Sequence, residues 1–313
     1  SGDPQFVFVH VDVGTMFASG AVSNAWHSKA GLVLCAGRAP YTSSGELPGG
    51  KDNYIQWSQE PQDQSGILRN YVKWHYELAV PQAVAPVVSR AFELARSAPA
   101  GPVYLTAARE VLMQPVAGVH LPSRKDAQVP APAQPAAEAV SCAAAALLRA
   151  RRPLIFAGQN GRDPASVPEL ARLAHLLGAP VVDGYFAANL PGSHPLNVRN
   201  RLDEFLPQAD VVLFVDPHVP YVPLLVSPHP DATIIYLESD PLHANQARWE
   251  FPADIRLTGS PRLGLVALCE AIADLQTNSD KQAAAERSAF VAREQRQWLA
   301  MAEQNVRLRA REY

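Results

Sequence analysis

The chain has 313 residues, of which 48% are hydrophobic and 18% charged, and its formal net charge is −3. A chain of this composition can bury a sizeable core, and its length favours two domains. It has no basic run and no apolar stretch of bilayer-spanning length, so we expect a cytoplasmic protein that binds neither nucleic acid nor membranes.

The first 116 residues alternate between strand and helix patterns. The opening run predicts a buried strand at 6–13 that stops at Gly14-Thr15, and helical spacing begins at Met16. Residues 38–60 are polar and rich in Gly, Ser and Pro, which predicts a long functional loop. The alternation indicates a largely parallel sheet. The other predicted elements are a strand at 31–37, a partly helical stretch ending in a short strand near 72–74, a helix at 83–97 and a strand at 101–108.

Residues 117–136 are rich in proline and poor in large apolar side chains, which predicts an extended linker. Residues 137–279 then alternate helices with apolar strands, as in a doubly wound α/β domain. Residues 280–313 are charged and helix-forming, and predict a surface or linker helix. The elements predicted in the second domain are helices at 137–152 and 164–178, strands at 153–158 and 179–184, a short helix and strand within 203–216, a strand at 232–240, and a short strand and helix within 256–275.

The three cysteines lie far apart in apolar strand or helix contexts, at Cys35, Cys142 and Cys269. Their odd number and wide spacing favour free, buried thiols over a disulfide or a metal site.

Several segments occur in the order found in one known superfamily. The first domain contains "HVDVGTMFASGAVSNAW", "GLVLCAGRAP" and "IQWSQEPQDQSGILRNYVKW", and the second contains "RRPLIFAGQNG" and "QADVVLFVD" followed by "ATIIYLESDP". This ordered set resembles the thiamine-diphosphate-dependent decarboxylases and carboligases. The resemblance implies an α/β fold with two doubly wound, mainly parallel sheets. They would be a partial pyrimidine-binding domain at 1–116 and a Rossmann-like central domain at 137–279.

The resemblance also implies a function, and it implies that the chain is a fragment of a longer protein. It implies a 2-oxo acid decarboxylase or carboligase, acetolactate-synthase-like, that is a lyase or transferase using thiamine diphosphate and Mg²⁺ as a homodimer or homotetramer. The chain would be an internal piece that lacks the family's pyrimidine-contacting glutamate upstream and the whole pyrophosphate domain, and would be inactive alone. The residues leave an alternative open: a non-catalytic nucleotide-binding or interaction module on the same scaffold.

In the first domain, no catalytic residue is predicted, because the expected glutamate would lie upstream. The resemblance places Gly14, Thr15 and Gln59 at the pyrimidine ring of the cofactor, whereas the alternative is a turn glycine and a solvated loop amide. His10 follows the pattern of a buried strand, which favours a hydrogen-bonded core histidine over a base. The helix that begins near Phe17 carries small residues, including Ala21, and predicts a contact with another chain.

In the second domain, the resemblance points to a nucleotide site at the strand ends. The predicted residues are Gly158, Asp216, Glu238 and Ser239. Relatives bind FAD, ADP, a CoA nucleotide or nothing there, and the sequence leaves this choice open. No metal site is predicted, because the histidines near Asp216 match no ligand spacing.

Overall fold

A computed structural model describes residues 2–119, 129–184 and 188–309. The chain divides into two compact units, residues 1–131 and 132–313. The division falls inside the range predicted as a linker, part of which, 120–128, lies outside the described residues. Each unit has its own sheet and is described by itself.

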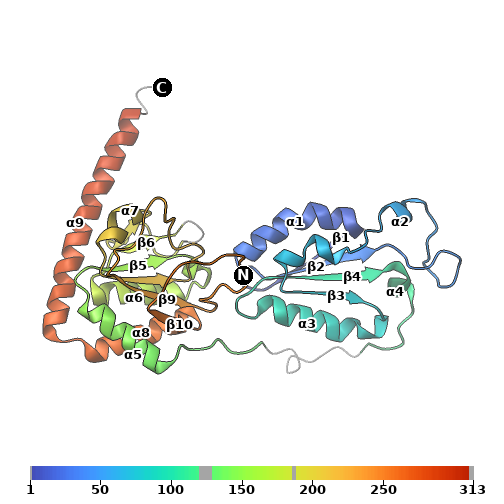
Figure 1. The fold of residues 1–313 in the computed structure, drawn as a ribbon, viewed down its shortest axis with the longest axis horizontal. Coiled ribbons are helices and arrows are strands. Elements are labelled where there is room, and N and C mark those ends of the chain that lie inside the picture. Colours follow the sequence, from blue (N-terminus) through green and yellow to red (C-terminus); the bar gives the residue numbers. More distant parts are fainter. Residues whose placement is uncertain (1, 120–128, 185–187, 310–313) are drawn as a thin grey trace. The chain divides into compact units, whose positions relative to one another are not determined.

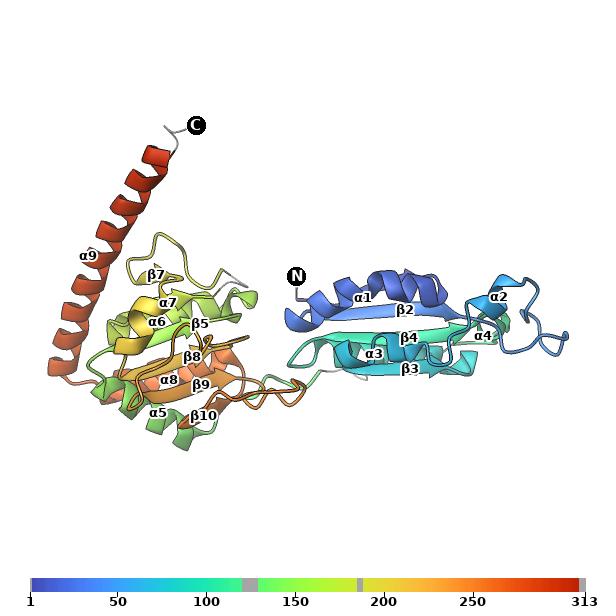
Figure 2. The same cartoon turned by 45° about the horizontal axis from the view of Figure 1, so that its top comes forward.

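Unit 1 is a four-stranded parallel sheet in the order β1-β2-β4-β3. Successive side chains of its central strands point to opposite faces of the sheet. Leu34 packs with Val22 of α1, whereas Val33 packs with Ala91 of α3. Helices α1 and α3 accordingly lie on opposite sides of the sheet (Figures 1 and 2). The elements are β1 (Gln5–Val9), α1 (Val11–His27), β2 (Leu32–Arg38), α2 (Ile55–Ser58), β3 (Trp74–Leu78), α3 (Val84–Arg96), β4 (Pro102–Ala108) and α4 (Arg109–Met113).

The start of unit 1 differs from the sequence prediction in two ways. Strand β1 is exposed rather than buried, with Phe6 48% and Phe8 57% exposed, because it is an edge strand that pairs only with β2. Helix α1 begins at Val11 instead of Met16, so Gly14 lies in its first turn rather than at a strand end. The sharp change of direction falls on Val11, whose φ of 39° is rare for a β-branched residue.

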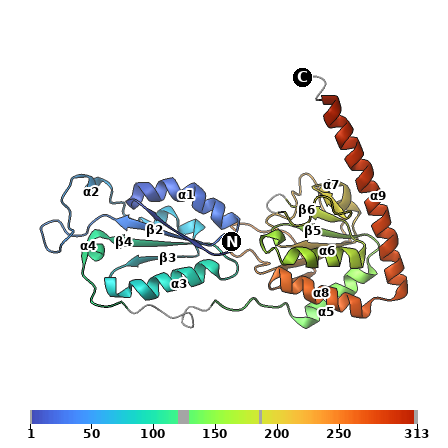
Figure 3. The same ribbon diagram turned by 180° about the vertical axis from the view of Figure 1, so that it is seen from behind.

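Unit 2 is a six-stranded parallel sheet in the order β10-β9-β8-β5-β6-β7. Renumbered within the unit, this is the 3-2-1-4-5-6 order, read from the other edge, of doubly wound nucleotide-binding folds. Helix α8 contacts both α5 and α6 beside the sheet (Figure 3). The elements are α5 (Ala137–Arg149), β5 (Pro153–Ala157), α6 (Ser166–Leu177), β6 (Val181–Asp183), β7 (Asn197–Arg199), α7 (Leu202–Phe205), β8 (Val211–Val215), β9 (Thr233–Glu238), β10 (Ile255–Thr258), α8 (Pro261–Leu275) and α9 (Asn278–Arg309).

The other face of this sheet is covered by aromatic side chains. Phe214 of β8 stacks on its register partner Tyr236 of β9, with ring centroids 5.2 Å apart. Tyr221, from the loop after β8, contacts both Phe214 and Phe251. Helices on one side and these rings on the other explain why β5, β8 and most of β9 are buried, and the α/β fold class predicted from the sequence is confirmed.

Helix α9 packs on unit 2 through its first half. Ala284 and Val291 are buried, and Arg287 donates through Nε and Nη2 to the carbonyl oxygen of Leu177, at 2.9 and 2.6 Å. The contact continues at Gln295, which is 3% exposed, and at Trp298, whose ring lies under Arg201, and the end of the helix extends away from the sheet (Figures 1 and 3). None of the described helices is both long and apolar enough to span a membrane.

Three smaller predictions need correction. Strand β3 lies at Trp74–Leu78 rather than near 72–74, and two 3₁₀ turns precede it. Strand β7 and helix α4 had no clear sequence signal because each is very short. The thiols are free but not all buried: Cys269 is buried, Cys35 is half-buried and Cys142 is exposed on α5. Burial raises the pKa of Cys35 to about 11 and that of Cys269 to about 12.

Candidate functional site

A pocket of about 230 Å³ opens in unit 1 where strands β1, β2 and β4 end. Parallel α/β sheets bind ligands at the carboxyl ends of their strands, because the loops there converge and helix N-termini point inward. The pocket combines apolar walls with a few polar side chains, as small-molecule sites do. The polar side chains that line it are His10, Arg38, Gln56, Gln59 and Arg109.

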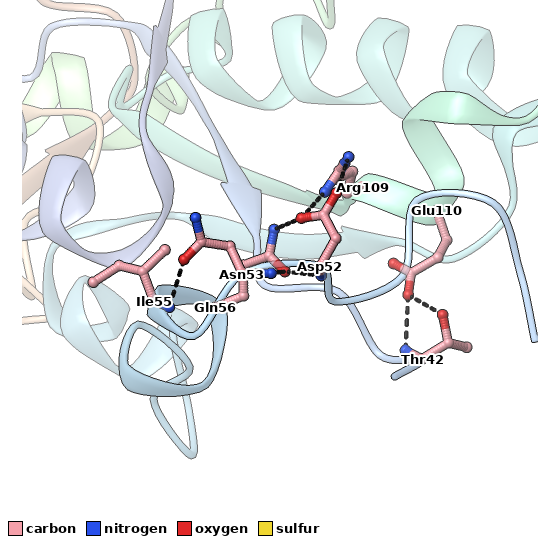
Figure 4. Close-up of polar contacts among 7 residues, drawn as sticks. All are labelled: Thr42, Asp52, Asn53, Ile55, Gln56, Arg109 and Glu110. Carbon is pink, nitrogen blue, oxygen red and sulfur yellow. Dashed lines mark hydrogen bonds and ion pairs between the residues drawn. The ribbon is translucent and has the colours of Figure 1, made fainter. Parts of the chain in front are cut away.

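One wall of the pocket is a loop that is tied to the end of β4. Arg109, the first residue after β4, donates through Nη1 and Nη2 to the two carboxylate oxygens of Asp52, each at 2.9 Å (Figure 4). Gln56 donates to the same carboxylate and accepts from the backbone N–H groups of Asp52 and Asn53. The hydrogen bond from Arg109, followed by that from Gln56, lowers the pKa of Asp52. These contacts hold α2, and Gln59 directly after it, at the strand ends.

A second tie fixes the beginning of the same loop. Glu110 is 1% exposed, and its Oε1 accepts from the backbone N–H and the hydroxyl of Thr42, both at 2.8 Å (Figure 4). Gly49 makes this approach possible, because a Cβ there would lie 3.2 Å from the backbone of Arg109 and Glu110. The loop predicted to be functional is therefore a fixed wall of the pocket.

A chain of buried hydrogen bonds connects two backbone positions that line the pocket. Thr15 donates to the carbonyl oxygen of Val11 at 2.7 Å, so its oxygen accepts from the hydroxyl of Tyr104, also at 2.7 Å. Gln64 donates to the oxygen of Tyr104 at 3.0 Å and to the carbonyl oxygen of Gly37 at 2.8 Å. Burial raises the pKa of Tyr104. The chain joins Val11 and Gly37, two backbone positions that line the pocket.

The three residues predicted for this site have different positions in the structure. Gln59 lines the pocket, Thr15 lies in the supporting hydrogen-bond chain, and Gly14 belongs to neither. Gly14 instead lets α1 pack on β1, since a Cβ at this position would lie 3.1 Å from Cβ of Val9. Whether any of them binds a ligand stays a prediction.

The sequence prediction was wrong about His10. It is exposed, it stands between β1 and α1, and it lines the pocket. Its position directly after a strand was a usable signal, because that is where the site edge of a parallel sheet lies. Arg109 carried the same signal after β4 and was also missed.

In unit 2, the predicted residues lie at one edge of the sheet. Gly158, Asp216 and Glu238 stand at the carboxyl ends of the neighbouring strands β5, β8 and β9. Asp216 is 2% exposed, adopts a φ of 47°, and pairs with Arg162 at 3.2 Å. A Cβ at Gly158 would lie 2.7 Å from Cα of Pro217, so only glycine fits there. This part of the edge is tightly closed.

The acidic end of β9 is closed as well. Glu238 is fully buried, and Nε2 of His243 lies 2.9 Å from its Oε2. Trp249 stacks on the ring of His243 with centroids 3.6 Å apart and covers the pair. Ser239 beside it is half-buried. A ribose hydroxyl would reach Glu238 only after His243 moved, so the geometry favours the unit 1 pocket as the candidate site.

No metal centre emerges from the part of the chain that the structure describes, where no three His, Cys, Asp or Glu side chains cluster suitably for an ion. His229 contacts Asp231 rather than Asp216.

Part of unit 2 is similar to a known protein family. Residues 140–268 match the family model described as "Thiamine pyrophosphate enzyme, central domain". The chain is 35% identical to sulfoacetaldehyde acetyltransferase of Rhodobacter capsulatus over 48% of the chain and 26% of that protein. It is 33% identical to benzoylformate decarboxylase of Pseudomonas aeruginosa over 51% of the chain and 28% of that protein.

A solved structure extends the likeness to both units. The crystal structure of benzoylformate decarboxylase from Polynucleobacter necessarius matches with a TM-score of 0.68 at 21% identity. The match covers 86% of this chain and 50% of that one. At this identity the likeness shows the fold alone. The chain spans about half the length of this structure and less of the two curated relatives.

Proposed function

We propose that the chain forms part of a thiamine pyrophosphate enzyme that acts on a small 2-oxo acid, because its residues 140–268 match the central-domain model of that family. The similarity to benzoylformate decarboxylase supports this substrate class, because benzoylformate is itself a 2-oxo acid. The reaction would be a decarboxylation, with or without transfer of the product to an acceptor as in acetolactate-synthase-like enzymes. The same proposal makes the enzyme a lyase or a transferase.

The unit 1 pocket fits part of the cofactor. Its volume of about 230 Å³ suits a single aminopyrimidine ring, and Gln59 offers both an amide donor and a carbonyl acceptor to such a ring. Ile55 and Leu112 supply apolar contact. Thiamine diphosphate, when bound, supplies the electron sink that stabilises an acyl carbanion. We assign no role to the described residues in holding its diphosphate or Mg²⁺.

His10 is the residue best suited to move a proton in this pocket. Among the described side chains that line it, His10 is the only imidazole, the group that most often acts as a general acid or base in enzymes. Arg38 and Arg109 are already paired, with Glu77 and Asp52 respectively. We therefore propose that Gln59 orients a bound ring and that His10 exchanges a proton with the substrate or the cofactor.

Assembly with a second copy is part of the same proposal. Helix α1 exposes a strip that includes Phe17 (86% exposed), Gly20 and Ala21. Small side chains beside a large exposed apolar residue suit close packing of another helix. If this strip is the interface of a homodimer or homotetramer, Ala21→Arg yields a monomer in light scattering with an unchanged circular dichroism spectrum. Loss of the fold instead would assign the strip to the core.

The pocket can be tested with the ring alone. Titration of the ¹⁵N-labelled chain with 4-amino-5-hydroxymethyl-2-methylpyrimidine is expected to shift the NMR signals of His10 and Gln59. Gln59→Leu abolishes the shifts, whereas His229→Ala, on an exposed loop of unit 2, leaves them unchanged. Shifts confined to unit 2 would contradict the assignment of this pocket.

Catalysis is tested on the chain as it stands, with benzoylformate and pyruvate in the presence of thiamine diphosphate and Mg²⁺. We expect no turnover and only weak cofactor binding in calorimetry, because the residues assigned here contact only the pyrimidine part. Micromolar binding by this chain alone would overturn that expectation.

A further inference from the structure

A cavity of about 520 Å³ lies at the edge of unit 2 opposite the predicted nucleotide site. Its floor is formed where strands begin, at Leu154 of β5, at Pro180 before β6 and at Ala209 before β8. Helix α9 forms one wall with Val291 and Phe290. The proposed function uses nothing at this edge of the sheet, so the cavity needs an explanation of its own.

The cavity has the size and lining of a site for a small organic molecule. Such sites occupy roughly 300–1,000 Å³ and are mostly apolar with a few polar groups that fix orientation. Leu154, Ala209 and Val291 are at most 4% exposed, and Phe205 and Phe290 add aromatic surface. An apolar ring or branched chain would find contact on several sides.

The polar groups around the cavity are mainly cationic. Four arginines line it against three glutamates. The glutamates are engaged by their own neighbours: Glu204 with Arg201, Glu286 with Gln282 and Glu294 with Arg293. In contrast, no ion pair within the described residues involves the side chains of Arg151, Arg152 or Arg287.

Arg201 adds a more specific observation. Its guanidinium lies over the rings of Phe205 and Trp298, at 5.2 and 5.6 Å from the centroids, and donates to Glu204 through Nε and Nη2. Its Nη1 is shielded from solvent and finds no acceptor among the residues that the structure describes. A buried donor without an acceptor is costly, and an anionic group in the cavity would satisfy it.

We propose that this cavity binds a small organic anion, namely a carboxylate carried on an aromatic or branched apolar body. The carboxylate accepts from Arg201 and from Arg151 or Arg152, which form no ion pair among the described residues, and the apolar body packs on Leu154, Phe205 and Val291. The site is independent of the proposed function, because it lies on the edge of the sheet away from the strand ends.

The experiment compares 1-naphthoate with its neutral isostere 1-naphthamide by calorimetry on the full chain. We expect one naphthoate to bind per chain. The amide should bind more weakly, by about tenfold or more, because it cannot accept the charge-assisted hydrogen bond that the carboxylate accepts. Equal affinities would overturn the proposal. So would displacement of naphthoate by inorganic sulfate at equal concentration, because the apolar body would then contribute nothing.

Variants locate the binding. Arg201→Met and Arg152→Gln are each expected to weaken naphthoate binding, the first by about tenfold. Arg262→Met is the matched control, since Arg262 pairs with Asp163 outside the cavity. Circular dichroism reports whether Arg201→Met folds, and the exposed Arg152 provides a second test if it does not. Unchanged affinity in folded variants at both positions would assign the binding elsewhere.

Discussion

The two units use the same parallel α/β layering but bury their sheets to different extents. In unit 2 the buried residues form one large cluster, and β5 and β8 are buried along their whole length. In unit 1 the core is divided between two small clusters, and the edge strand β1 is mostly exposed. The open pocket at the strand ends belongs to unit 1, whereas the corresponding edge of unit 2 is closed by Asp216 and the covered Glu238.

A well-buried sheet and an accessible site therefore need not occur in the same unit. Residues 140–268 of unit 2 match a family model, and the buried strands in this range restrict the residue types that fit there. Unit 1 places polar side chains from distant segments around a cavity and holds them with hydrogen bonds.

The largest effect is expected from the core of unit 2. Leu213 of β8 is fully buried, so Leu213→Ala removes apolar contacts and leaves a cavity, and should lower the free energy of unfolding by about 2–5 kcal/mol. Phe8→Ala in the exposed strand β1 should change it by about 0.5 kcal/mol or less. Urea denaturation followed by circular dichroism measures both. Equal losses would show that β1 is covered in solution.

Substitutions at two glycines should change the stability of the two units in opposite directions. Gly158→Ala places a methyl group against the backbone at Asp216 and Pro217, and should destabilise unit 2 by about 1–3 kcal/mol. Gly20 lies inside α1, and a Cβ there would meet nothing within 4 Å beyond its own helix, so Gly20→Ala should stabilise unit 1 by about 1 kcal/mol through helix propensity. Thermal unfolding of the two variants should shift in opposite directions, and shifts of the same sign would refute this explanation.

The strands that could be predicted from the sequence are those buried on both sides. The runs at β5, β8 and β9 are continuously apolar because both faces must be, and this pattern is visible without a structure. The start of α1 could not be placed, because Val11 adopts a backbone conformation that its residue type disfavours. Local sequence preference therefore pointed to a later helix start.

The candidate site was only partly predictable. Gln59 was found through a family resemblance, whereas His10 was misjudged because an edge strand and a buried strand can share the same residue pattern. The pairing of Arg109 with Asp52 joins residues 57 positions apart, and no sequence pattern near either residue predicts it. Side-chain partners at such separations follow from the tertiary fold alone.

A pH effect is expected in unit 1. Burial lowers the pKa of Lys73 to about 8 from the ordinary 10.5, although its ammonium group donates to the carbonyl oxygens of Leu94 and Ser97. Between these two values the unfolded chain binds more protons, so Lys73 contributes an increase in stability as pH rises from about 8 to 10.5, and no slope below pH 8.

The measurement is the difference between wild type and Lys73→Met in the free energy of unfolding across this pH range. The variant is expected to lose the increase, whereas Lys281→Met on the exposed surface of α9 keeps it. Parallel profiles for wild type and Lys73→Met would mean that the hydrogen bonds hold the charged form and that burial does not dominate.

The smallest effect is expected at the loop of the unit 1 pocket. Asp52→Asn removes the charge that Arg109 holds, but the pair is largely solvent-exposed, so global stability should scarcely change. The loop around residues 42–53 should nevertheless be cut faster in limited proteolysis, because one of its two ties is lost. Asp203→Asn, at an exposed position of α7 in unit 2, is the control. An unchanged cutting rate would show that Glu110 and Thr42 are sufficient to hold the loop.

The contact between Arg287 and Leu177 has a consequence for synthesis on the ribosome. The last carbonyl groups of α6 are satisfied by Gln276 and Arg287, which follow them by 100 and 110 residues. At translation rates of roughly 5–20 residues per second, these partners are made about 5–20 s after α6 itself. During that interval the last carbonyl groups of a nascent α6 are hydrated or covered by a chaperone. Unit 2 therefore reaches its final packing only after the start of α9 has left the exit tunnel.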